Sequence, residues 1–165
     1  MIKAAVVILN YNGAALLQQF LPSVIANTPL WCSIIVADNA STDHSLSVMK
    51  QHFPDVSCIE MQQNTGFAGG YNNALHQIDA EYFILLNSDI EVTPQWIEPV
   101  IEFMDKHADV AACQPKILAY HQKEFFEHAG ACGGYIDYLG YPFCRGRIFN
   151  SLEQDENQYS ANKEI

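Results

Sequence analysis

Four short polar clusters in the sequence carry side chains that could bind a polar ligand or a metal ion. Each cluster follows a short apolar run of the kind that forms a buried β-strand. In sequence order they are Asn10-Tyr11-Asn12, Asp38-Asn39, Asn64 to Gly70, and Asn87-Ser88-Asp89. In an open parallel α/β sheet, ligands bind at the carboxyl ends of the strands. Polar clusters at successive strand ends therefore predict one ligand site along one edge of a sheet.

The third and fourth clusters indicate what this site could bind. Gly66, Gly69 and Gly70 would let a ligand approach the backbone closely before a helix N-terminus, as phosphate-binding loops do. The segment matches neither G-x-G-x-x-G nor the P-loop, and a flexible turn is the alternative. Asn87-Ser88-Asp89 places an amide and a carboxylate two residues apart, which suits a hard cation such as Mg²⁺ or Mn²⁺. The alternative is a turn in which both side chains cap backbone amides.

The elements that would position these clusters alternate between strands and helices over the first 115 residues. Strands are expected at residues 4–9, 33–37, 56–61, 82–86 and 110–114. Helices are expected at residues 14–26, where Pro22 would kink or divide the helix, and at 45–53, 70–78 and 93–107. Ser41-Thr42-Asp43 and Thr93 are the expected caps of the second and fourth helices. Because the strands are apolar on both faces, this order predicts a mostly parallel sheet covered by helices.

The overall composition limits the kind of partner. The chain has 165 residues, with 8 Lys and Arg against 19 Asp and Glu, and a formal net charge of −11. This acidity argues against nucleic acid or anionic lipid as a partner, since both require a basic surface. No apolar run reaches the ~18 residues that a membrane-spanning helix needs. Five cysteines without a C-x-x-C pair favour a reducing compartment, so we expect a cytoplasmic chain with one well-packed core.

The four clusters, in this order and spacing, resemble those of family 2 inverting glycosyltransferases with the GT-A fold, especially the bacterial rhamnosyltransferase-like branch. The segments that carry the resemblance are Val6 to Asn12, Ile35 to Asp43, Asn64 to Asn72, and Leu85 to Val92. The resemblance covers residues 4–118 and extends more loosely to about residue 150. It implies a Rossmann-like α/β fold with a mostly parallel central sheet and helices on both faces.

The resemblance also implies that the polar clusters bind a nucleoside diphosphate sugar. The residues that match the family's binding motifs are Asn10, Tyr11, Asn12, Asp38, Asn39, Ser41, Asn64, Gly66, Phe67, Asn72, Asn87 and Ser88. The turn after the first strand would flank the base, and Asp38 would accept a hydrogen bond from a pyrimidine imide N–H. Residues after the third strand would line the nucleotide and sugar pocket. Uracil and thymine both offer an imide N–H, so UDP- and dTDP-sugars are the expected donors, and the branch favours dTDP-rhamnose.

Asn87-Ser88-Asp89 stands at the family's metal-binding D-x-D position, with Asn87 in place of the first aspartate. The resemblance therefore implies a divalent metal, Mg²⁺ or Mn²⁺, held by Asp89 and by the two phosphates of the donor. A cation would also let a chain of charge −11 hold an anionic nucleotide. The implied reaction is inverting transfer of a sugar to a glycan or lipid-linked acceptor in bacterial cell-surface polysaccharide synthesis. It would occur in the cytoplasm or at the inner face of the plasma membrane, with peripheral membrane association of the full-length protein.

The family's catalytic base has no match in this sequence. The G-A-x-x-x-x-R segment and the later E-D pair are missing, and Asp137 and Glu127 are poor candidates for the base. We expect residues 1–118 to form the nucleotide-sugar-binding region, 119–150 to begin a Gly- and aromatic-rich acceptor-side region, and 151–165 to be a frayed end. On this interpretation the chain is truncated at its C-terminus. It would bind donor without transferring sugar, and its exposed aromatic residues would favour self-association.

Two other functions fit part of the pattern. A sugar-nucleotide pyrophosphorylase has a related fold, but usually carries a glycine-rich loop with Arg and Lys directly after the first strand. Here Asn10-Tyr11-Asn12-Gly13-Ala14 follows that strand, and the next Lys or Arg is Lys50. The other alternative is a nucleotide-binding module without catalysis. Titration of nucleotides with and without Mn²⁺ separates these alternatives.

Overall fold

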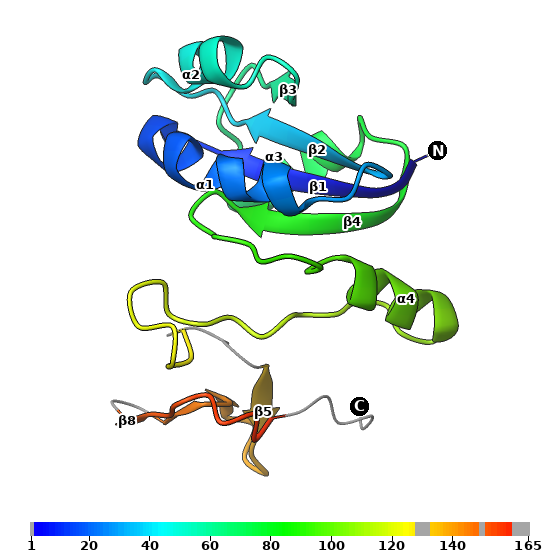
Figure 1. Cartoon of the computed structure of the whole chain (residues 1–165), viewed down its shortest axis with the longest axis vertical. Helices are drawn as coiled ribbons and strands as arrows, with labels where there is room; N and C mark the ends of the chain where they lie inside the picture. The colour runs from blue at the N-terminus through cyan, green and yellow to red at the C-terminus, as the bar shows by residue number, and fades with distance from the viewer. Residues whose placement is uncertain (1, 128–132, 149–150, 160–165) are drawn as a thin grey trace. The chain divides into compact units, whose positions relative to one another are not determined.

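The computed structural model describes residues 2–127, 133–148 and 151–159 (Figure 1). The chain divides into two compact units, residues 1–102 and residues 103–165. The first unit contains all four polar clusters identified in the sequence. The four described cysteines are free, and Cys132 lies outside the described residues.

The first unit is built on a four-stranded parallel sheet (Figure 1). Its strands are β1 (Ile2–Asn10), β2 (Cys32–Asp38), β3 (Ser57–Glu60) and β4 (Ala80–Asn87), in the spatial order β3-β2-β1-β4. The chain runs outward from β1 through β2 to β3, and then returns to the other side of β1 as β4. Each neighbouring pair is parallel, as the alternation of strands and helices predicts.

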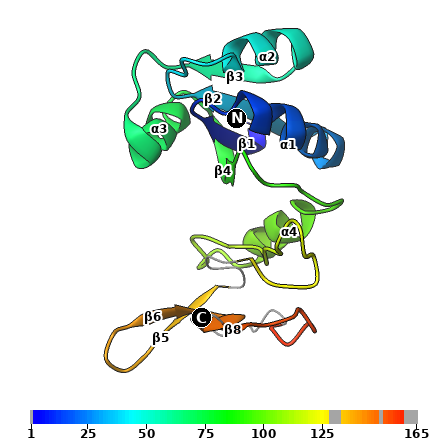
Figure 2. The same cartoon turned by 90° about the vertical axis from the view of Figure 1, so that its left-hand side faces the viewer.

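Helices cover both faces of this sheet because its strands carry apolar residues on both faces. α1 (Ala14–Asn27) and α2 (Ser45–His52) lie on one face, and α3 (Gly66–Leu75) lies on the other (Figure 2). Along β1, Val6 and Ile8 pack in the core under α1 and α2, whereas Ala5 and Val7 pack in the core under α3. One strand thus supplies both cores through its alternating side chains. The expected α/β fold class is confirmed.

Two helices begin at positions that the sequence did not predict. α3 begins at Gly66 rather than Gly70, and the Gly66 N–H donates to Asn64 Oδ1 at 2.8 Å, which secures the early start. α4 (Glu98–Lys106) begins after the expected cap Thr93. Gln95 has a φ of 60°, a left-handed conformation that does not fit the interior of an α-helix, so the helix starts only beyond it.

The structure differs from the sequence-based expectations at two further points. Residues 110–114 form no strand, because they lie largely exposed and have no partner strand among the described residues. Pro22 lies inside α1 without dividing it, so the helix continues to Asn27.

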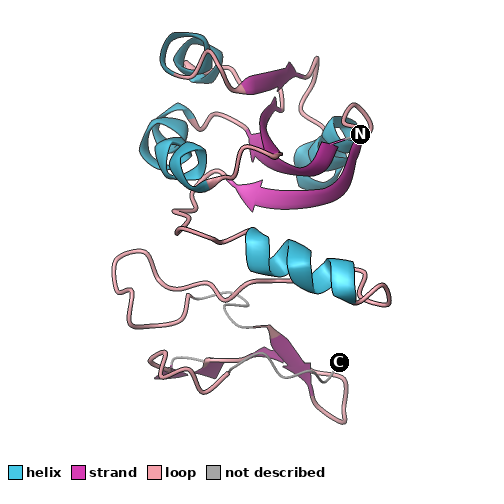
Figure 3. Ribbon diagram, turned by 45° about the vertical axis from the view of Figure 1, so that its right-hand side comes forward, coloured by secondary structure: helices cyan, strands magenta, loops and turns pink. Residues whose placement is uncertain are grey.

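The second unit contains short antiparallel strand pairs (Figure 3). β5 (Gly134–Ile136) pairs with β6 (Pro142–Cys144), and β7 (Arg147–Ile148) pairs with β8 (Ser151–Leu152). No helix in the part of the chain that the structure describes is both long and apolar enough to cross a membrane.

Candidate functional site

The carboxyl ends of the parallel strands lie in register, so the polar residues that follow them meet at one edge of the sheet. In the ladder, Asn10 pairs with Asp38, and Asp38 pairs with Glu60. On the other side of β1, Leu9 pairs with Asn87. The clusters that follow β1, β2 and β4 are therefore neighbours. We call this edge, with the loops that follow its strands, the polar edge.

Asn10 and Asp38 form the buried centre of the polar edge. Asn10 is 0% exposed and Asp38 is 2% exposed. Asn10 Nδ2 donates to Asp38 Oδ1 at 2.9 Å and to Ser41 Oγ at 3.1 Å. The backbone N–H of Ser41 donates to Asp38 Oδ2 at 2.8 Å. Each carboxylate oxygen thus accepts one of these hydrogen bonds and keeps lone-pair capacity for a further donor.

The turn after β1 approaches Asn10 so closely that position 13 requires glycine. A Cβ atom on Gly13 would lie 2.4 Å from Asn10 Oδ1 and 3.8 Å from Ser88 Oγ. Asn10 Oδ1 is buried and accepts no hydrogen bond from the described residues. The glycine therefore lets the turn after β1 lie directly against Asn10 and close to Ser88, the residue that follows β4.

Asn12 joins the turn after β1 to the loop after β2. Its Oδ1 accepts hydrogen bonds from the backbone N–H groups of Thr42 at 2.7 Å and Asp43 at 3.2 Å. Its own N–H donates to Ser41 Oγ at 2.9 Å. Asn12 has a φ of 54°, a left-handed conformation that asparagine tolerates better than most residues. The side chain of Tyr11, next to it, is 51% exposed at the rim of the polar edge.

Asp43 caps two helices at once. Its Oδ2 accepts from the N–H of Ala14, the first residue of α1, at 3.1 Å, and its Oδ1 accepts from the N–H of Ser45, the first residue of α2, at 2.9 Å. Neither helix is capped by its own N-cap side chain. Desolvation opposes ionisation of Asp43, but the hydrogen bonds from Ser45 and Ala14 outweigh it and lower the pKa of the carboxyl. The sequence predicted only the cap on α2.

The segment after β3 is tied to the polar edge through Asn39. Asn39 Nδ2 donates to Asn64 Oδ1 and to the carbonyl oxygen of Gly66, at 3.0 Å each. Asn39 Oδ1 accepts from the backbone N–H of Thr65 at 3.1 Å. A fourth hydrogen bond to this segment comes from Asn73, whose Nδ2 donates to Thr65 Oγ1 at 3.1 Å. The segment is therefore a braced loop rather than a flexible turn.

The first turns of α3 present an exposed aromatic side chain next to a buried one. Phe67 is 67% exposed and packs edge-on against the ring of Tyr71, with 5.0 Å between the ring centroids. The Tyr71 hydroxyl donates to the carbonyl oxygen of Leu86 in β4 at 3.0 Å, and burial raises the pKa of Tyr71. The Asn72 side chain is exposed and forms no hydrogen bond with the described residues.

The residues at the end of β4 offer exposed oxygen atoms. Asn87 and Asp89 are exposed, and the Asp89 carboxylate has no hydrogen-bond or ion-pair partner among the described residues. No group of three or more His, Cys, Asp and Glu in those residues could hold a metal ion. A single carboxylate fits a hard cation such as Mg²⁺ where phosphate oxygens and water complete the coordination. Asp89 can supply that single carboxylate. The described residues around it do not supply a complete set of metal ligands.

The residues expected from the sequence thus fall into three groups. Those joined by the hydrogen bonds described above are Asn10, Asn12, Asp38, Asn39, Ser41, Asn64 and Gly66. Those with exposed side chains at the rim are Tyr11, Phe67, Asn87 and Asp89. The third group is Ser88 and Asn72. Ser88 is half-buried beside the turn after β1, and Asn72 is exposed on α3 without a side-chain hydrogen bond to the described residues. Gly13 was not among the expected residues, although its position directly after a polar turn was a usable signal.

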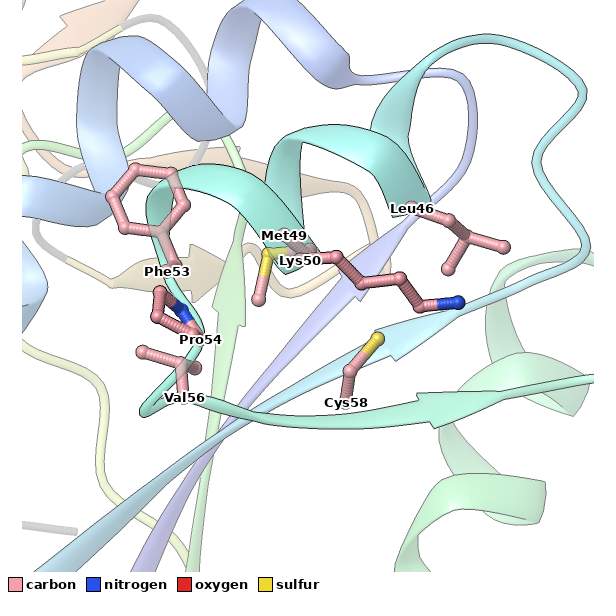
Figure 4. Close-up of a pocket in the computed structure, with 7 residues that line it drawn as sticks. All are labelled: Leu46, Met49, Lys50, Phe53, Pro54, Val56 and Cys58. Atoms are coloured by element: carbon pink, nitrogen blue, oxygen red, sulfur yellow. The ribbon is translucent and has the colours of Figure 1, made fainter.

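A separate hollow of about 230 Å³ lies between α2 and β3 (Figure 4). Its lining residues are Leu46, Met49, Lys50, Phe53, Pro54, Val56 and Cys58. Burial raises the pKa of the Cys58 thiol to about 11, so this thiol stays protonated and unreactive at neutral pH. Lys50 forms an ion pair with Glu60 at 3.1 Å. The polar edge, and not this largely apolar hollow, gathers the groups that can bind a polar ligand.

Comparison with known proteins identifies relatives of the chain. Residues 5–156 match the protein-family model described as "Glycosyl transferase family 2". An uncharacterized glycosyltransferase of Haemophilus influenzae is 27% identical over 127 residues, which cover 73% of this chain and 38% of that protein. The N-acetylglucosaminyl-diphospho-decaprenol L-rhamnosyltransferase of Mycobacterium tuberculosis is 26% identical over 123 residues, covering 68% of this chain and 40% of that enzyme. The chain therefore spans about two fifths of the length of these two relatives.

Solved structures share the fold of about two thirds of the chain. The crystal structure of S. aureus TarS 1-349 in complex with UDP-GlcNAc superposes with a TM-score of 0.57 at 22% identity. The match covers 64% of this chain and 32% of that chain. At 22% identity this similarity shows a shared arrangement of helices and strands, and it shows nothing about the ligand of this chain.

Proposed function

Because the chain belongs to glycosyl transferase family 2 and has the GT-A fold, we propose that it binds a nucleoside diphosphate sugar at the polar edge and serves inverting transfer of the sugar. The acceptor would be a glycan or a lipid-linked glycan in cell-surface polysaccharide synthesis, on the cytoplasmic side of the membrane. The convergence of Asn10, Asp38 and Asn87 at one edge carries this proposal. Three adjacent strand ends that all present oxygen and amide groups suit a ligand with a base, a ribose and phosphates.

The base of the nucleotide would bind near Asp38. Asp38 Oδ1 and Oδ2 each accept one hydrogen bond from the protein, and a carboxylate oxygen can accept a second. An imide N–H of uracil or thymine is a donor of the right kind for that remaining capacity. The exposed ring of Tyr11 and the half-buried Ser41 would flank the base. UDP- and dTDP-sugars are therefore the proposed donors, and the rhamnosyltransferase among the relatives supports dTDP-rhamnose.

The diphosphate and the sugar would extend toward α3 and the end of β4. Asn64, Gly66 and Phe67 would line this part of the site, because the braced loop holds them at the rim. GT-A glycosyltransferases generally use a divalent metal. Asp89 would hold Mg²⁺ or Mn²⁺, with Asn87 beside it, and the remaining ligands would come from phosphate and water. Such an ion neutralises the charge that develops on a departing diphosphate.

No residue of this chain is assigned as the general base. In an inverting transfer, the acceptor hydroxyl attacks the anomeric carbon in line with the departing diphosphate, and a carboxylate takes the hydroxyl proton. Asp137 Oδ1 accepts from the backbone N–H groups of Leu139 and Tyr141 at 2.9 Å each, so this carboxylate stabilises the turn between β5 and β6. The groups identified here bind and orient the donor, and they stabilise the leaving group.

Chemical-shift mapping tests the proposed site. UDP is titrated into the ¹⁵N-labelled chain in the presence of Mg²⁺, which is diamagnetic. The expected result is that backbone signals of Tyr11, Ser41, Gly66 and Asp89 shift with one common affinity. Signals from the hollow between α2 and β3, such as that of Val56, serve as the internal control and are expected to stay in place. Shifts confined to that hollow, or no shifts at all, would refute the proposed site.

A further inference from the structure

The side chain of Asn39 directs all three of its hydrogen bonds to a single loop. Asn39 is 2% exposed. Its Nδ2 donates to Asn64 Oδ1 and to the Gly66 carbonyl oxygen at 3.0 Å each, and its Oδ1 accepts from the Thr65 N–H at 3.1 Å. The three bonds go to three consecutive residues. Because the amide is buried and both of its N–H donors are taken, it has no donor left for a ligand.

The backbone and the surroundings of Asn39 are fixed as firmly as its side chain. Its backbone N–H donates to the carbonyl oxygen of Asn10 at 2.8 Å, which ties it to the end of β1. A Cβ atom on Gly70 would lie 3.0 Å from Asn39 Nδ2 and 2.8 Å from Leu9 Cδ1. The helix α3 therefore packs directly on the amide. Asn39 connects the ends of β1 and β2 with the first turns of α3.

The loop that Asn39 holds leads directly into residues of the proposed donor site. Gly66 has a φ of 76°, a left-handed turn from which the chain enters α3. Phe67 follows it, 67% exposed and in contact with the Tyr71 ring. The position of Phe67 and of the Asn64 side chain thus depends on where residues 64–66 are held.

We propose that Asn39 is a positioning residue, which holds residues 64–66 in the geometry that binds the nucleotide without itself touching the nucleotide. This inference rests on the proposed function of the polar edge. A loop fixed before binding loses less conformational freedom when the ligand arrives, so the affinity is higher than for a mobile loop. The contribution of Asn39 to nucleotide binding is therefore indirect, and it depends on the hydrogen bonds that its side-chain NH₂ group donates to the loop.

Asn39→Asp tests this role with little change in side-chain volume. The substitution replaces the Nδ2 donor by an oxygen that faces two acceptors, Asn64 Oδ1 and the Gly66 carbonyl oxygen. Like-signed partial charges at 3.0 Å repel, so residues 64–66 are expected to leave their place. Asn39→Ala is the milder second variant, because it removes the three bonds without adding repulsion.

Asn27 provides a matched control. Its Nδ2 also donates to two carbonyl oxygens, those of Ser23 at 2.9 Å and Val92 at 3.3 Å. Asn27 ends α1, whose 14 residues separate it from the turn after β1 by about 20 Å. Asn27→Asp and Asn27→Ala therefore impose the same chemical change on two carbonyl oxygens that belong neither to residues 64–66 nor to the residues of the proposed donor site.

Two measurements are made on the wild-type chain and on the four variants. The first is amide hydrogen exchange at residues 65–67 without ligand, and the second is UDP affinity with Mn²⁺. Both Asn39 variants are expected to lose protection at Thr65 and to bind UDP about tenfold more weakly or worse. The Asn27 variants are expected to have lower melting temperatures, wild-type exchange at residues 65–67, and UDP affinity within about twofold of the wild type.

The possible failures can be told apart. An Asn39→Ala chain that keeps wild-type exchange at residues 65–67, or wild-type UDP affinity, refutes the positioning role. An equal loss of affinity in the Asn27 variants also refutes it, because the effect would then be one of general stability. A wild-type chain that does not bind UDP refutes the proposed function instead, and the exchange data still decide whether Asn39 holds the loop.

Discussion

Ala40, in the loop after β2, adopts a left-handed backbone conformation with a φ of 61°. A Cβ atom makes this conformation unfavourable by roughly 1–2 kcal/mol, and glycine avoids that cost. Ala40→Gly is therefore expected to raise the free energy of unfolding, by about 0.5–1 kcal/mol after the greater flexibility of glycine in the unfolded chain is allowed for. Urea denaturation followed by circular dichroism measures this difference.

Ala26→Gly is the control for that substitution. Ala26 is exposed in the helix α1, where glycine is about 1 kcal/mol less favourable than alanine. The two alanine-to-glycine changes should thus shift stability in opposite directions. A loss of stability in Ala40→Gly would mean that the left-handed loop is not strained.

Asp38→Asn is expected to weaken both the fold and nucleotide binding. The two carboxylate oxygens face donors, Asn10 Nδ2 and the Ser41 N–H, so an NH₂ group on either side leaves a buried donor unpaired. Such a group costs about 1–3 kcal/mol of stability. Loss of the charged acceptor should also lower UDP affinity by about tenfold or more.

Melting curves and calorimetric titration separate the two effects of Asp38→Asn when binding is measured well below the melting temperature. UDP affinity equal to that of the wild type, in a chain shown to be folded, would remove Asp38 from the nucleotide site.

Asp89→Ala is expected to act on the metal-dependent part of binding alone. Asp89 is exposed and has no partner among the described residues, so its removal should leave the melting temperature of the ligand-free chain unchanged. UDP affinity with Mn²⁺ should fall by about tenfold, since one charge-assisted contact is worth roughly 1.5–3 kcal/mol. Titration of UDP with and without Mn²⁺ measures this.

Asp55→Ala is the matched control, because Asp55 is an exposed carboxylate in the turn between α2 and β3. It should bind UDP as the wild type does. If Asp89→Ala behaves like Asp55→Ala, then Asn87-Ser88-Asp89 is an ordinary turn.

At the residue level, the sequence predicts which polar side chains gather but not which of them are buried. Asn10, Asp38 and Asn39 could be expected at strand ends because the apolar runs before them are clear. Their burial depends on partners far along the chain, such as Thr65 for Asn39. No local pattern encodes those partners, so the distinction between contacting and positioning residues appears only in the structure.

Asp43 links the starts of α1 and α2, and its substitution tests how far these elements depend on one carboxylate. Asn in its place keeps one acceptor oxygen and can cap only one of the two helices. Asp43→Asn is expected to lower the free energy of unfolding by about 1 kcal/mol at pH 7, the usual cost of a lost cap.

The effect of Asp43→Asn should also depend on pH. The pKa of Asp43 is lowered in the folded chain from its ordinary value of 3.8. A group with a depressed folded pKa contributes stability above its unfolded pKa and loses it as the pH falls through the folded pKa. The difference in stability between wild type and variant should thus be full at pH 7 and shrink below about pH 4.

Denaturation at several pH values measures this dependence, with Asp55→Asn as the control for a general effect of charge. A difference that stays constant down to pH 2.5 would contradict the double cap.

At the level of elements, the four parallel strands and the helices α1 and α2 were predictable from apolar periodicity and polar turns. The start of α3 was not, because Gly66, Gly69 and Gly70 have low helix propensity and the loop contacts that favour the helix are non-local. The start of α4 depends on the left-handed residue Gln95, which sequence gives no reason to expect. Residues 110–114 have the composition of a strand, but a strand also needs a partner.

The charge of the whole chain gives a reason to expect metal-dependent nucleotide binding that is independent of Asp89. A net charge of −11 repels a free nucleoside diphosphate, which is itself an anion. The described residues offer no cluster of cation ligands of their own, so a divalent ion would arrive together with the phosphates. The family membership and the geometry of the polar edge both support binding of a metal–nucleotide pair.

Calorimetric titration of UDP into the 165-residue chain, with Mn²⁺ and again with a chelator, tests that account most directly. We expect one binding site per chain with Mn²⁺, and an affinity at least about tenfold lower without it, since the ion offsets repulsion between like charges. The same titration with dTDP should give a similar affinity, because both bases carry the imide N–H that Asp38 would accept. Absence of binding with Mn²⁺ present, for both nucleotides, would contradict the claim that the polar edge is a nucleotide-sugar site.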